Sequence, residues 1–567
     1  MDPLSLWHSG SNSGLHSDPG DRSAAADRPG GRRALPARYN AAVDLIDRHL
    51  QAGRGERIAF IDDAGALTYA ELGERVDRAG SLLVSLGVQP EQRVLLILKD
   101  TVSFPVLFFG AIKIGAVPVP VNTLLSAEDY AEIVADSRAV VLAVSSSLWP
   151  RLAGAVAAAA APQLRHVLVD QEPEGGGGSG DAPRGVTCHV GRLPELLAPH
   201  RAERAPAATT PDDACFWLYT SGSTGRLKAA VHAHGDMIYT AEHYAVGVLG
   251  LDERDVVFSA AKLFFAYGLG NAMSFPLAVG ATAVLMAERP TPAAIARRLR
   301  AHRPTLFFGV PTLYAAMLAE PELVTGGRLR ACVSAGEALP PEVGRRFKER
   351  TGVDILDGIG STEMLHIFLS NRPGDVRYGT TGRPVPGYSL RLLDESGQEV
   401  GPGEIGDLWV SGASSATHYF NRRALSQRTF VGPWTRTGDH YLRDTDGYYV
   451  YQGRSDDMLK VSGQYVSPFE VESALVSHPA VLEAAVIGHA DEHGLIKPKA
   501  LVVLKAAPAG DAGEREPEAL TEALQAHVKA RLAPFKYPRW IEFVAELPKT
   551  ATGKIQRFKL RKAASGA

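Results

Sequence analysis

Residues 219–228 carry the residue types that bind polyphosphate. They read Tyr-Thr-Ser-Gly-Ser-Thr-Gly-Arg-Leu-Lys and follow an apolar run at 216–218. Glycines let the backbone approach a ligand closely, hydroxyls and N–H groups donate to phosphate oxygens, and a lysine offsets their charge. The spacing differs from the Walker-type loop, G-x-x-x-x-G-K-[ST]. A solvated turn has a similar composition, so this segment alone leaves both interpretations open.

Four further motifs follow at wide intervals. Residues 358–363 (GIGSTE) place a hydroxyl and a carboxylate after an expected strand, and Mg²⁺ prefers carboxylate oxygens together with substrate phosphates. In 437–439 (TGD), Asp439 could accept hydrogen bonds from ribose hydroxyls. Residues 453–457 (GRSDD) lie where the sequence pattern changes, and 548–556 (PKTATGKIQ) place Lys554 on a glycine-bearing loop. Each motif alone is typical of a turn. All five motifs in this order would rarely occur together by chance, so they indicate one functional site.

Alternating strand-like and helical patterns must position these motifs. Such alternation between residues 58 and 144 is typical of a layered α/β domain. The expected strands are 59–61, 94–98 and 139–144, and the expected helices are 69–86 and 103–115. Short strands with turns between 389 and 410 indicate a β-rich subdomain. The predicted fold class is therefore α/β: layered α/β subdomains and a β-rich subdomain in a large N-terminal domain, then a small α+β domain.

Composition suggests the domain limits. Residues 1–36 are rich in Gly, Ser, Asp, Arg and Ala and predict a disordered leader, and the glycine-rich run 175–180 predicts a flexible surface insertion. We expect an N-terminal domain over 37–453, a hinge over 454–457 and a C-terminal domain over 458–567. The last unit has an ordinary domain size.

Charge and composition exclude several classes of protein. The chain has 567 residues, a net charge of −3 and a pI near 6.6, which argues against a nucleic-acid binder with a broad basic face. Its three cysteines form no C-x-x-C motif, so they predict neither a disulfide framework nor a zinc site. Prolines and a lysine interrupt the most apolar run, 102–121, which disfavours a membrane span. We expect a cytoplasmic protein with no nucleic-acid or membrane partner.

The ordered motifs resemble those of the adenylate-forming superfamily of acyl- and aryl-CoA synthetases, over about residues 39–562. The segments 263–271, 358–371 and 460–468 are similar to benzoate–CoA ligases and their hydroxybenzoate relatives. This resemblance implies ATP, Mg²⁺ and coenzyme A as cofactors and a small aryl carboxylate as substrate. The acid would attack ATP to give an acyl-adenylate and pyrophosphate, and the thiol of coenzyme A would then displace AMP. A rotating C-terminal domain would serve both steps.

The resemblance also implies a role for each motif residue. The catalytic residues would be Lys554, Thr362 and Glu363, with Glu363 as the metal ligand. Asp456 would be the hinge residue. The residues that would hold ATP or AMP are Thr220, Ser221, Ser223, Thr224, Lys228, Asp439 and Arg454.

An aryl pocket is implied in the same way. Its lining would be Ala266, Tyr267, Ala335, Gly360, His366 and Ile367. Small residues leave room for a flat ring, while Tyr267 and Ile367 supply apolar walls and His366 could hydrogen-bond near the carboxylate or a ring substituent. Phe265 and Gly463 would line the coenzyme A tunnel. Because these lining positions include no Lys or Arg, we predict a neutral ring with a single carboxylate.

The chain departs from the family pattern at two positions, and other functions stay open. Leu227 and Ala229 stand where the family usually has Pro and Gly, and Ala229 would be strained if that position needed a positive φ.

The alternative functions are an aryl-acid adenylation enzyme that loads a carrier-protein phosphopantetheine, and a nucleotide-binding sensor or scaffold with little catalysis. A lysine acetyltransferase acting on Lys554 would be a regulatory partner, because acetylation removes the charge.

Overall fold

The structure is a computed structural model. It describes residues 34–159, 161–171, 186–221, 227–323, 325–454, 457–461, 464–492, 495–505, 517–549 and 555–564. The glycine-rich run 175–180 and most of the leader 1–36 lie outside these residues. So do several predicted site residues: Ser223, Thr224, Asp456, Gly463 and Lys554.

A five-stranded parallel sheet forms the N-terminal layer, in the order β4-β3-β5-β6-β7. Its strands are β3 (Arg93–Ile97), β4 (Val117–Pro120), β5 (Val141–Ser145), β6 (His166–Asp170) and β7 (Thr187–Gly191). β5 is buried along its whole length, as expected for a parallel strand covered on both faces. The helices of this region are η1 (Val43–Asp47), α1 (Arg48–Gln51), α2 (Tyr69–Ser85), α3 (Ser103–Lys113), α4 (Ala127–Ser137), α5 (Trp149–Ala158) and α6 (Leu193–Leu197). Thr68 and Glu71 form a capping box that fixes the start of α2.

A nine-stranded sheet occupies the centre, in the order β16-β15-β14-β13-β12-β10-β11-β1-β2. Its inner strands from β1 to β14 are parallel, and its edges are antiparallel. The strands are β1 (Ile58–Asp62), β2 (Gly65–Thr68), β10 (Val256–Ser259), β11 (Thr282–Val284), β12 (Leu306–Gly309), β13 (Ala331–Ser334), β14 (Ile355–Gly360), β15 (Ile367–Ser370) and β16 (Arg383–Pro384). Ligands of open α/β sheets bind at the carboxyl ends of the strands, so the residues after β13 and β14 are candidates for function.

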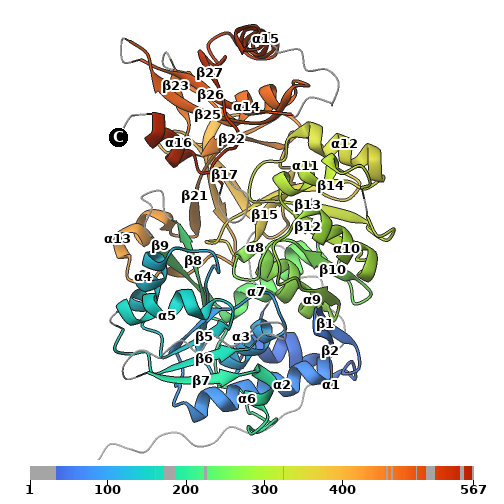
Figure 1. The fold of residues 1–567 in the computed structure, drawn as a ribbon, viewed down its shortest axis with the longest axis vertical. Coiled ribbons are helices and arrows are strands. Elements are labelled where there is room, and N and C mark those ends of the chain that lie inside the picture. The colour runs from blue at the N-terminus through green and yellow to red at the C-terminus, as the bar shows by residue number, and fades with distance from the viewer. Residues whose placement is uncertain are drawn as a thin grey trace, which may run out of the picture.

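Helices pack beside this central sheet (Figure 1). They are α7 (His234–Thr240), η2 (Ala241–Val246), α8 (Ala266–Leu269), η3 (Gly270–Ser274), α9 (Phe275–Val279), α10 (Pro292–His302), α11 (Pro311–Ala319) and α12 (Pro341–Thr351). Among the described residues, no helix is long and apolar enough to cross a membrane.

Two smaller sheets complete the region before residue 455. A hairpin of β8 (Ala214–Ser221) and β9 (Leu227–Ala233) pairs with β19 (His418–Tyr419). The β-rich subdomain contains β17 (Ser389–Leu393), β18 (Ile405–Ser411), β20 (Phe430–Val431), β21 (Trp434–Arg443) and β22 (Tyr449–Arg454), with α13 (Arg423–Thr429) beside it.

The residues after 457 gather at one end of the molecule, at the top of Figure 1. Their strands are β23 (Leu459–Val461), β24 (Gln464–Val466), β25 (Val481–Ala490), β26 (Ile496–Leu504) and β27 (Trp540–Phe543), and their helices are α14 (Pro468–Val476), α15 (Pro517–Lys529) and α16 (Arg557–Ala564). The α/β fold class is confirmed, with a large N-terminal part and a smaller C-terminal part. The limits 37–453, 454–457 and 458–567 stay predictions.

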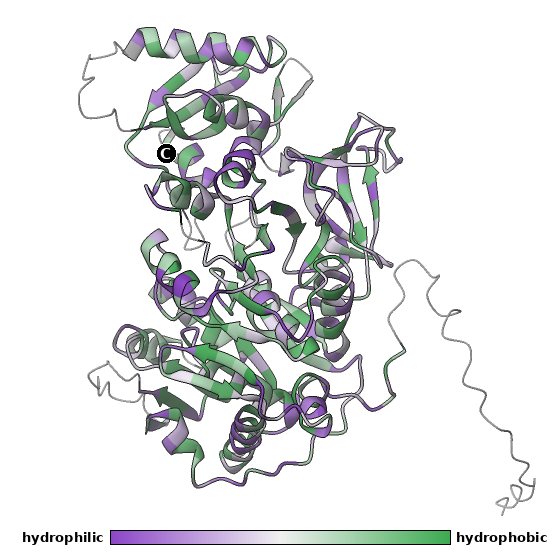
Figure 2. Ribbon diagram, turned by 90° about the vertical axis from the view of Figure 1, so that its right-hand side faces the viewer, coloured by the Kyte–Doolittle hydropathy of each residue, from purple (hydrophilic) through white to green (hydrophobic). Residues whose placement is uncertain are grey.

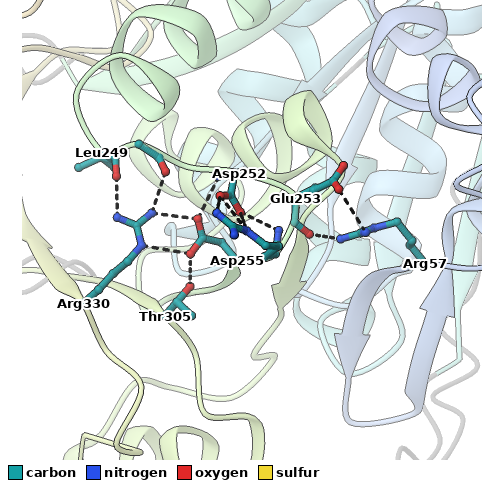
Figure 3. A network of polar contacts seen from close by, with 9 residues as sticks. Arg57, Leu249, Asp252, Glu253, Asp255, Thr305 and Arg330 are labelled. Atoms are coloured by element: carbon teal, nitrogen blue, oxygen red, sulfur yellow. Dashed lines mark hydrogen bonds and ion pairs between the residues drawn. The ribbon is translucent and has the colours of Figure 1, made fainter.

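Apolar side chains fill the layers, and a polar network fastens the amino ends of three central strands. Figure 2 shows the hydrophobic colour concentrated on the sheets, with hydrophilic residues on the outer helices. Asp255, Thr305 and Arg330 each immediately precede a strand, β10, β12 and β13 respectively. Arg330 donates to both Asp255 carboxylate oxygens at 3.1 and 2.9 Å and to the Leu249 carbonyl at 2.6 Å (Figure 3). Thr305 donates to Asp255 at 2.6 Å, so these strand starts are linked by side chains.

Candidate functional site

The β8–β9 hairpin carries the predicted phosphate-binding segment. Thr220 on β8 lies opposite Lys228 on β9 in the antiparallel register. Residues 222–226, with Ser223 and Thr224, lie outside the described residues, as does the side chain of Ser221. Ala229 pairs with Tyr219 inside the strand and is absent from the described non-glycine residues with positive φ. The strain considered for Ala229 is therefore not present.

Lys228 reaches a charged cluster at the end of β14. Its ammonium lies 3.1 Å from the Glu363 carboxylate and donates to the Tyr419 hydroxyl at 2.7 Å. Tyr419 in turn donates to Glu363 at 2.5 Å. Burial pushes the pKa of Glu363 up, but Lys228 and the Tyr419 hydroxyl outweigh it and hold that pKa below the usual value. Glu363 is thus kept as a carboxylate, the form that a hard cation needs.

The backbone at Thr362 and Glu363 is held from neighbouring strands. His232 on β9 lies 2.8 Å from the Thr362 carbonyl through Nε2 and 3.0 Å from Asp236 through Nδ1, and both side chains are fully buried. The Ala416 N–H donates to the Glu363 carbonyl at 2.7 Å. The His232 contact fixes Thr362 to the β8–β9 hairpin, which local sequence patterns could not show.

Asp439 and Arg454, the predicted ribose residues, are neighbours on β21 and β22. They are paired in register, and the Arg454 guanidinium lies 3.1 Å from the Asp439 carboxylate. The negative charge of Asp439, which lies at hydrogen-bond distance, raises the pKa of Arg454.

Four of the six predicted pocket residues, Tyr267, Gly360, His366 and Ile367, lie together near the carboxyl ends of β13 and β14. Ala266 and Tyr267 begin α8, Ala335 follows β13, Gly360 ends β14, and His366 and Ile367 begin the antiparallel return. The Tyr267 hydroxyl lies 3.1 Å from the Val333 carbonyl, and its ring centroid lies 5.6 Å from that of His366. A Cβ on Gly360 would come within 2.5 Å of the His366 carbonyl, so this glycine permits a close backbone approach. Phe265, a predicted tunnel residue, directly precedes α8 and is partly buried.

His366, a predicted pocket residue, is buried and neutral. Its Nε2 lies 3.1 Å from the Asn271 side-chain oxygen, and its ring centroid lies 4.4 Å from that of Phe275. Burial lowers the pKa of His366 to about 3. A neutral ring with Nε2 engaged can donate to Asn271 and adds no charge to the pocket.

The C-terminal part contacts the pocket segment directly. The Ile555 N–H donates to Glu337 at 3.0 Å. Ile555 directly follows Lys554 in the sequence, and Glu337 is two residues beyond Ala335. Lys554 itself lies outside the described residues, so its placement stays a prediction.

Sequence reasoning missed four residues around the site: His232, Asn271, Glu337 and Tyr419. Each contacts a partner between 56 and 218 positions away in the chain, so no local spacing pairs them. A tyrosine at 419, beside other aromatic and polar residues, gives no signal of its own.

Comparisons with known proteins identify the family of the chain. The AMP-binding enzyme family matches residues 47–420, and the AMP-binding enzyme C-terminal domain matches residues 470–554. The chain is 60% identical to a benzoate–CoA ligase of Thauera aromatica, over 93% of this chain and 97% of the relative. It is 52% identical to a 4-hydroxybenzoate–CoA/benzoate–CoA ligase of Rhodopseudomonas palustris, over 94% and 96%.

Solved structures give the same result. A benzoate CoA ligase from Burkholderia xenovorans LB400 matches with a TM-score of 0.82 and 52% identity, over 92% of this chain and 100% of that one. The anthranilate CoA ligase AuaEII in complex with anthranoyl-AMP matches with a TM-score of 0.86 and 42% identity, over 94% and 98%. The chain therefore belongs to the AMP-binding enzyme family of adenylate-forming enzymes.

Proposed function

We propose that the protein is an aryl-CoA ligase that activates benzoate or a closely related aryl carboxylate with ATP and passes the acyl group to coenzyme A. The observation that carries this proposal is one meeting point: the Lys228–Glu363 cluster and the Tyr267–His366 pocket both lie at the carboxyl ends of β13 and β14. Relatives with 60% and 52% identity are named as ligases of benzoate or 4-hydroxybenzoate, which supports the substrate class.

In the first step, an oxygen of the acid attacks the α-phosphorus of ATP, and the bond from that phosphorus to pyrophosphate breaks. We assign Thr362 to the α-phosphate, and Lys554 to the acid and α-phosphate, where its charge offsets the charge that builds as two anions meet. The residues assigned to the β- and γ-phosphates are Thr220, Ser221, Ser223, Thr224 and Lys228.

In the second step, the sulfur of coenzyme A loses its proton and attacks the acyl carbon, and the bond from that carbon to AMP breaks. We assign Asp439 and Arg454 to the ribose throughout, and Phe265 and Gly463 to the path of the thiol. Asp456 is proposed as the hinge that lets the C-terminal part turn between steps.

Magnesium fits the residues at Glu363. A bound Mg²⁺ neutralises phosphate charge, and its preferred ligands are carboxylate and phosphate oxygens. Glu363 is the carboxylate here, kept ionised by Lys228 and Tyr419. No group of three or more His, Cys, Asp or Glu among the described residues could hold a metal alone, so phosphate oxygens would complete the coordination.

The pocket favours an uncharged ring. Ala266 and Ala335 are buried and small, and His366 is neutral at working pH. Burying a second charged group there would cost several kcal/mol, on the order of the desolvation cost of an ion in a protein interior. We therefore propose that the acid carries a single carboxylate on a neutral ring.

A panel of acids tests the proposed function. The purified protein is mixed with ATP, Mg²⁺ and coenzyme A, and AMP release is measured with benzoate, its 2-, 3- and 4-substituted forms, octanoate and acetate. We expect kcat/KM for benzoate or one substituted benzoate to exceed that for the aliphatic acids by at least about 10-fold, a typical discrimination of an apolar pocket. A preference for octanoate or acetate would contradict the pocket assignment.

The acceptor and the regulation are tested on the same preparation. We propose free coenzyme A as the acceptor, and thioester formation on a carrier protein instead would favour a loading enzyme.

We also propose that acetylation of Lys554 by an acetyltransferase would stop adenylation, because it removes the ammonium charge. Full adenylation by Lys554→Gln would rule out this switch.

A further inference from the structure

Lys228 and Glu363, which we assign to different ligands, form an ion pair with each other in this structure. Lys228 is assigned to phosphate and Glu363 to a cation, yet their side chains lie 3.1 Å apart, and each is only 15% exposed. A charge so far removed from water needs a partner, because an isolated buried ion is costly. When substrate arrives, Lys228 must turn toward phosphate, and Glu363 then loses its partner.

Tyr419 is bonded to both members of this pair, and the direction of its hydroxyl is fixed. A lysine ammonium can only donate, so the hydroxyl accepts from Lys228 at 2.7 Å. Its single proton is then directed at Glu363, at 2.5 Å. Both Tyr419 and Lys228 contact the same carboxylate oxygen, Oε1.

The position of Tyr419 does not depend on substrate. The residue is 1% exposed and lies on β19, where it pairs with Ala230 of β9. Its N–H donates to the Ser426 hydroxyl at 3.0 Å, and its ring centroid lies 5.1 Å from that of Phe430. These contacts come from groups with no assigned ligand, so they persist when Lys228 moves.

We propose that Tyr419 is a positioning residue for the metal-binding carboxylate. It keeps its hydrogen bond to Oε1 of Glu363 when Lys228 leaves, and so it would fix the orientation of the carboxylate that holds the cation. Partners that orient metal ligands typically contribute 10- to 100-fold to metal affinity. This inference rests on the proposed function, since it requires Mg²⁺ to accompany ATP at Glu363.

Tyr419→Phe isolates the hydroxyl, because it keeps the ring over which the Lys228 ammonium lies, at 4.2 Å from the centroid. The measurement is binding of ATP by calorimetry with neither acid nor coenzyme A present, at a series of Mg²⁺ concentrations and in EDTA. We expect the Mg²⁺ concentration for half-maximal enhancement of ATP binding to rise about 10- to 100-fold. ATP binding in EDTA should change by less than about 3-fold. The matched control is Tyr130→Phe, which loses a hydroxyl bonded to the Asn122 carbonyl at 2.9 Å, away from Glu363.

The outcomes separate the possible errors. A Tyr419→Phe protein with the wild-type Mg²⁺ requirement would overturn the inference. Equal losses of ATP affinity with and without Mg²⁺ would also overturn it, because they would indicate a merely structural role. A wild-type protein that binds no ATP at all would overturn the proposed function, and this inference with it. In steady state we expect a raised KM for MgATP that excess Mg²⁺ restores, with a smaller change in kcat.

Discussion

The strands of the central sheet carry charged residues at both ends. The charges at their amino ends (the amino edge) and at their carboxyl ends (the carboxyl edge) are used in opposite ways. At the amino ends of β10, β12 and β13, Arg330 donates hydrogen bonds to Asp255 and to backbone carbonyls (Figure 3). At the carboxyl ends, Lys228 and Glu363 are bonded mainly to side chains, namely each other and Tyr419. The first arrangement is complete within the protein, whereas the second can exchange its partners for a ligand.

This difference shows where charge stabilises the fold and where it serves chemistry. Backbone carbonyls such as that of Leu249 are fixed by the chain, so a guanidinium bound to them links strands permanently. Side-chain partners such as Lys228 and Glu363 can rotate away from each other when a ligand replaces the contact. Charges at the carboxyl edge should therefore matter for catalysis, and charges at the amino edge for stability.

The largest expected effect concerns Lys554, which we propose acts on substrates bound at the carboxyl edge. Lys554→Ala should slow formation of the acyl-adenylate by about 10²- to 10³-fold, the usual cost of removing one group that stabilises transition-state charge. Conversion of a supplied acyl-AMP to thioester should largely survive. Pyrophosphate release reports the first step, and thioester formation reports the second. Undiminished adenylate formation would remove the central role given to this lysine.

The next effect concerns the amino edge. Arg330→Met leaves the Asp255 side chain, which is only 8% exposed, without its guanidinium, and should lower the free energy of unfolding by about 2–3 kcal/mol. The activity of the remaining folded protein should stay within about 2-fold. Arg254→Met is the matched control, because Arg254 pairs with Asp252 on the surface with its side chain 84% exposed, and its loss should leave the free energy of unfolding nearly unchanged. An Arg330→Met protein with normal stability and impaired catalysis would contradict the assignment of the amino edge to stability.

Acid should affect the two edges in different pH windows. Burial lowers the pKa of His366 from 6.5 to about 3 in the folded protein. Between these values the unfolded chain binds more protons, so stability falls as the pH drops below 6.5, by about 2 kcal/mol at pH 5. At the amino edge, burial opposes ionisation of Asp255, but Arg330 and Thr305 hold its pKa below 3.8. That contribution is lost only as the pH falls below about 3.8.

His366→Gln tests the upper window. The glutamine amide can still donate toward Asn271 but cannot take up a proton. The measurement is the melting temperature of ligand-free protein at pH 7 and pH 5. We expect the wild type to lose more stability than the variant over this interval, whatever constant cost the substitution adds. Identical losses in both proteins would show that His366 does not titrate as its burial indicates.

The sequence predicted the layers of the fold and named candidate site residues that the structure brings together, such as Lys228 and Glu363, but not the contacts between distant strands. Strands such as β5 are apolar runs, and motifs such as that around Glu363 follow strand ends, so both leave local signals. The Tyr419–Glu363 contact depends on how β19 pairs with β9, which no spacing in the chain encodes. The reason for Gly360 was also hidden, because only the close His366 backbone shows why a side chain cannot fit there.

The smallest expected effect concerns how the C-terminal part docks on the carboxyl edge. Glu337 accepts a hydrogen bond from the Ile555 N–H at 3.0 Å, next to Lys554 in the sequence. A hydrogen bond to a charged group contributes about 1.5–3 kcal/mol at most, and one that forms in a single domain orientation contributes less. Glu337→Ala should therefore slow adenylate formation by about 3- to 10-fold.

Conversion of supplied acyl-AMP to thioester by Glu337→Ala should stay unchanged, because we propose that the C-terminal part has turned away by that step. Glu342→Ala is the control, since that carboxylate pairs with Arg345 on the exposed surface of α12. If both half-reactions slowed equally, the contact would support the fold in general rather than one orientation. If only adenylate formation slowed, Glu337 would act by holding the segment that precedes Ile555 during that step. The charged residues of the amino edge have no such role.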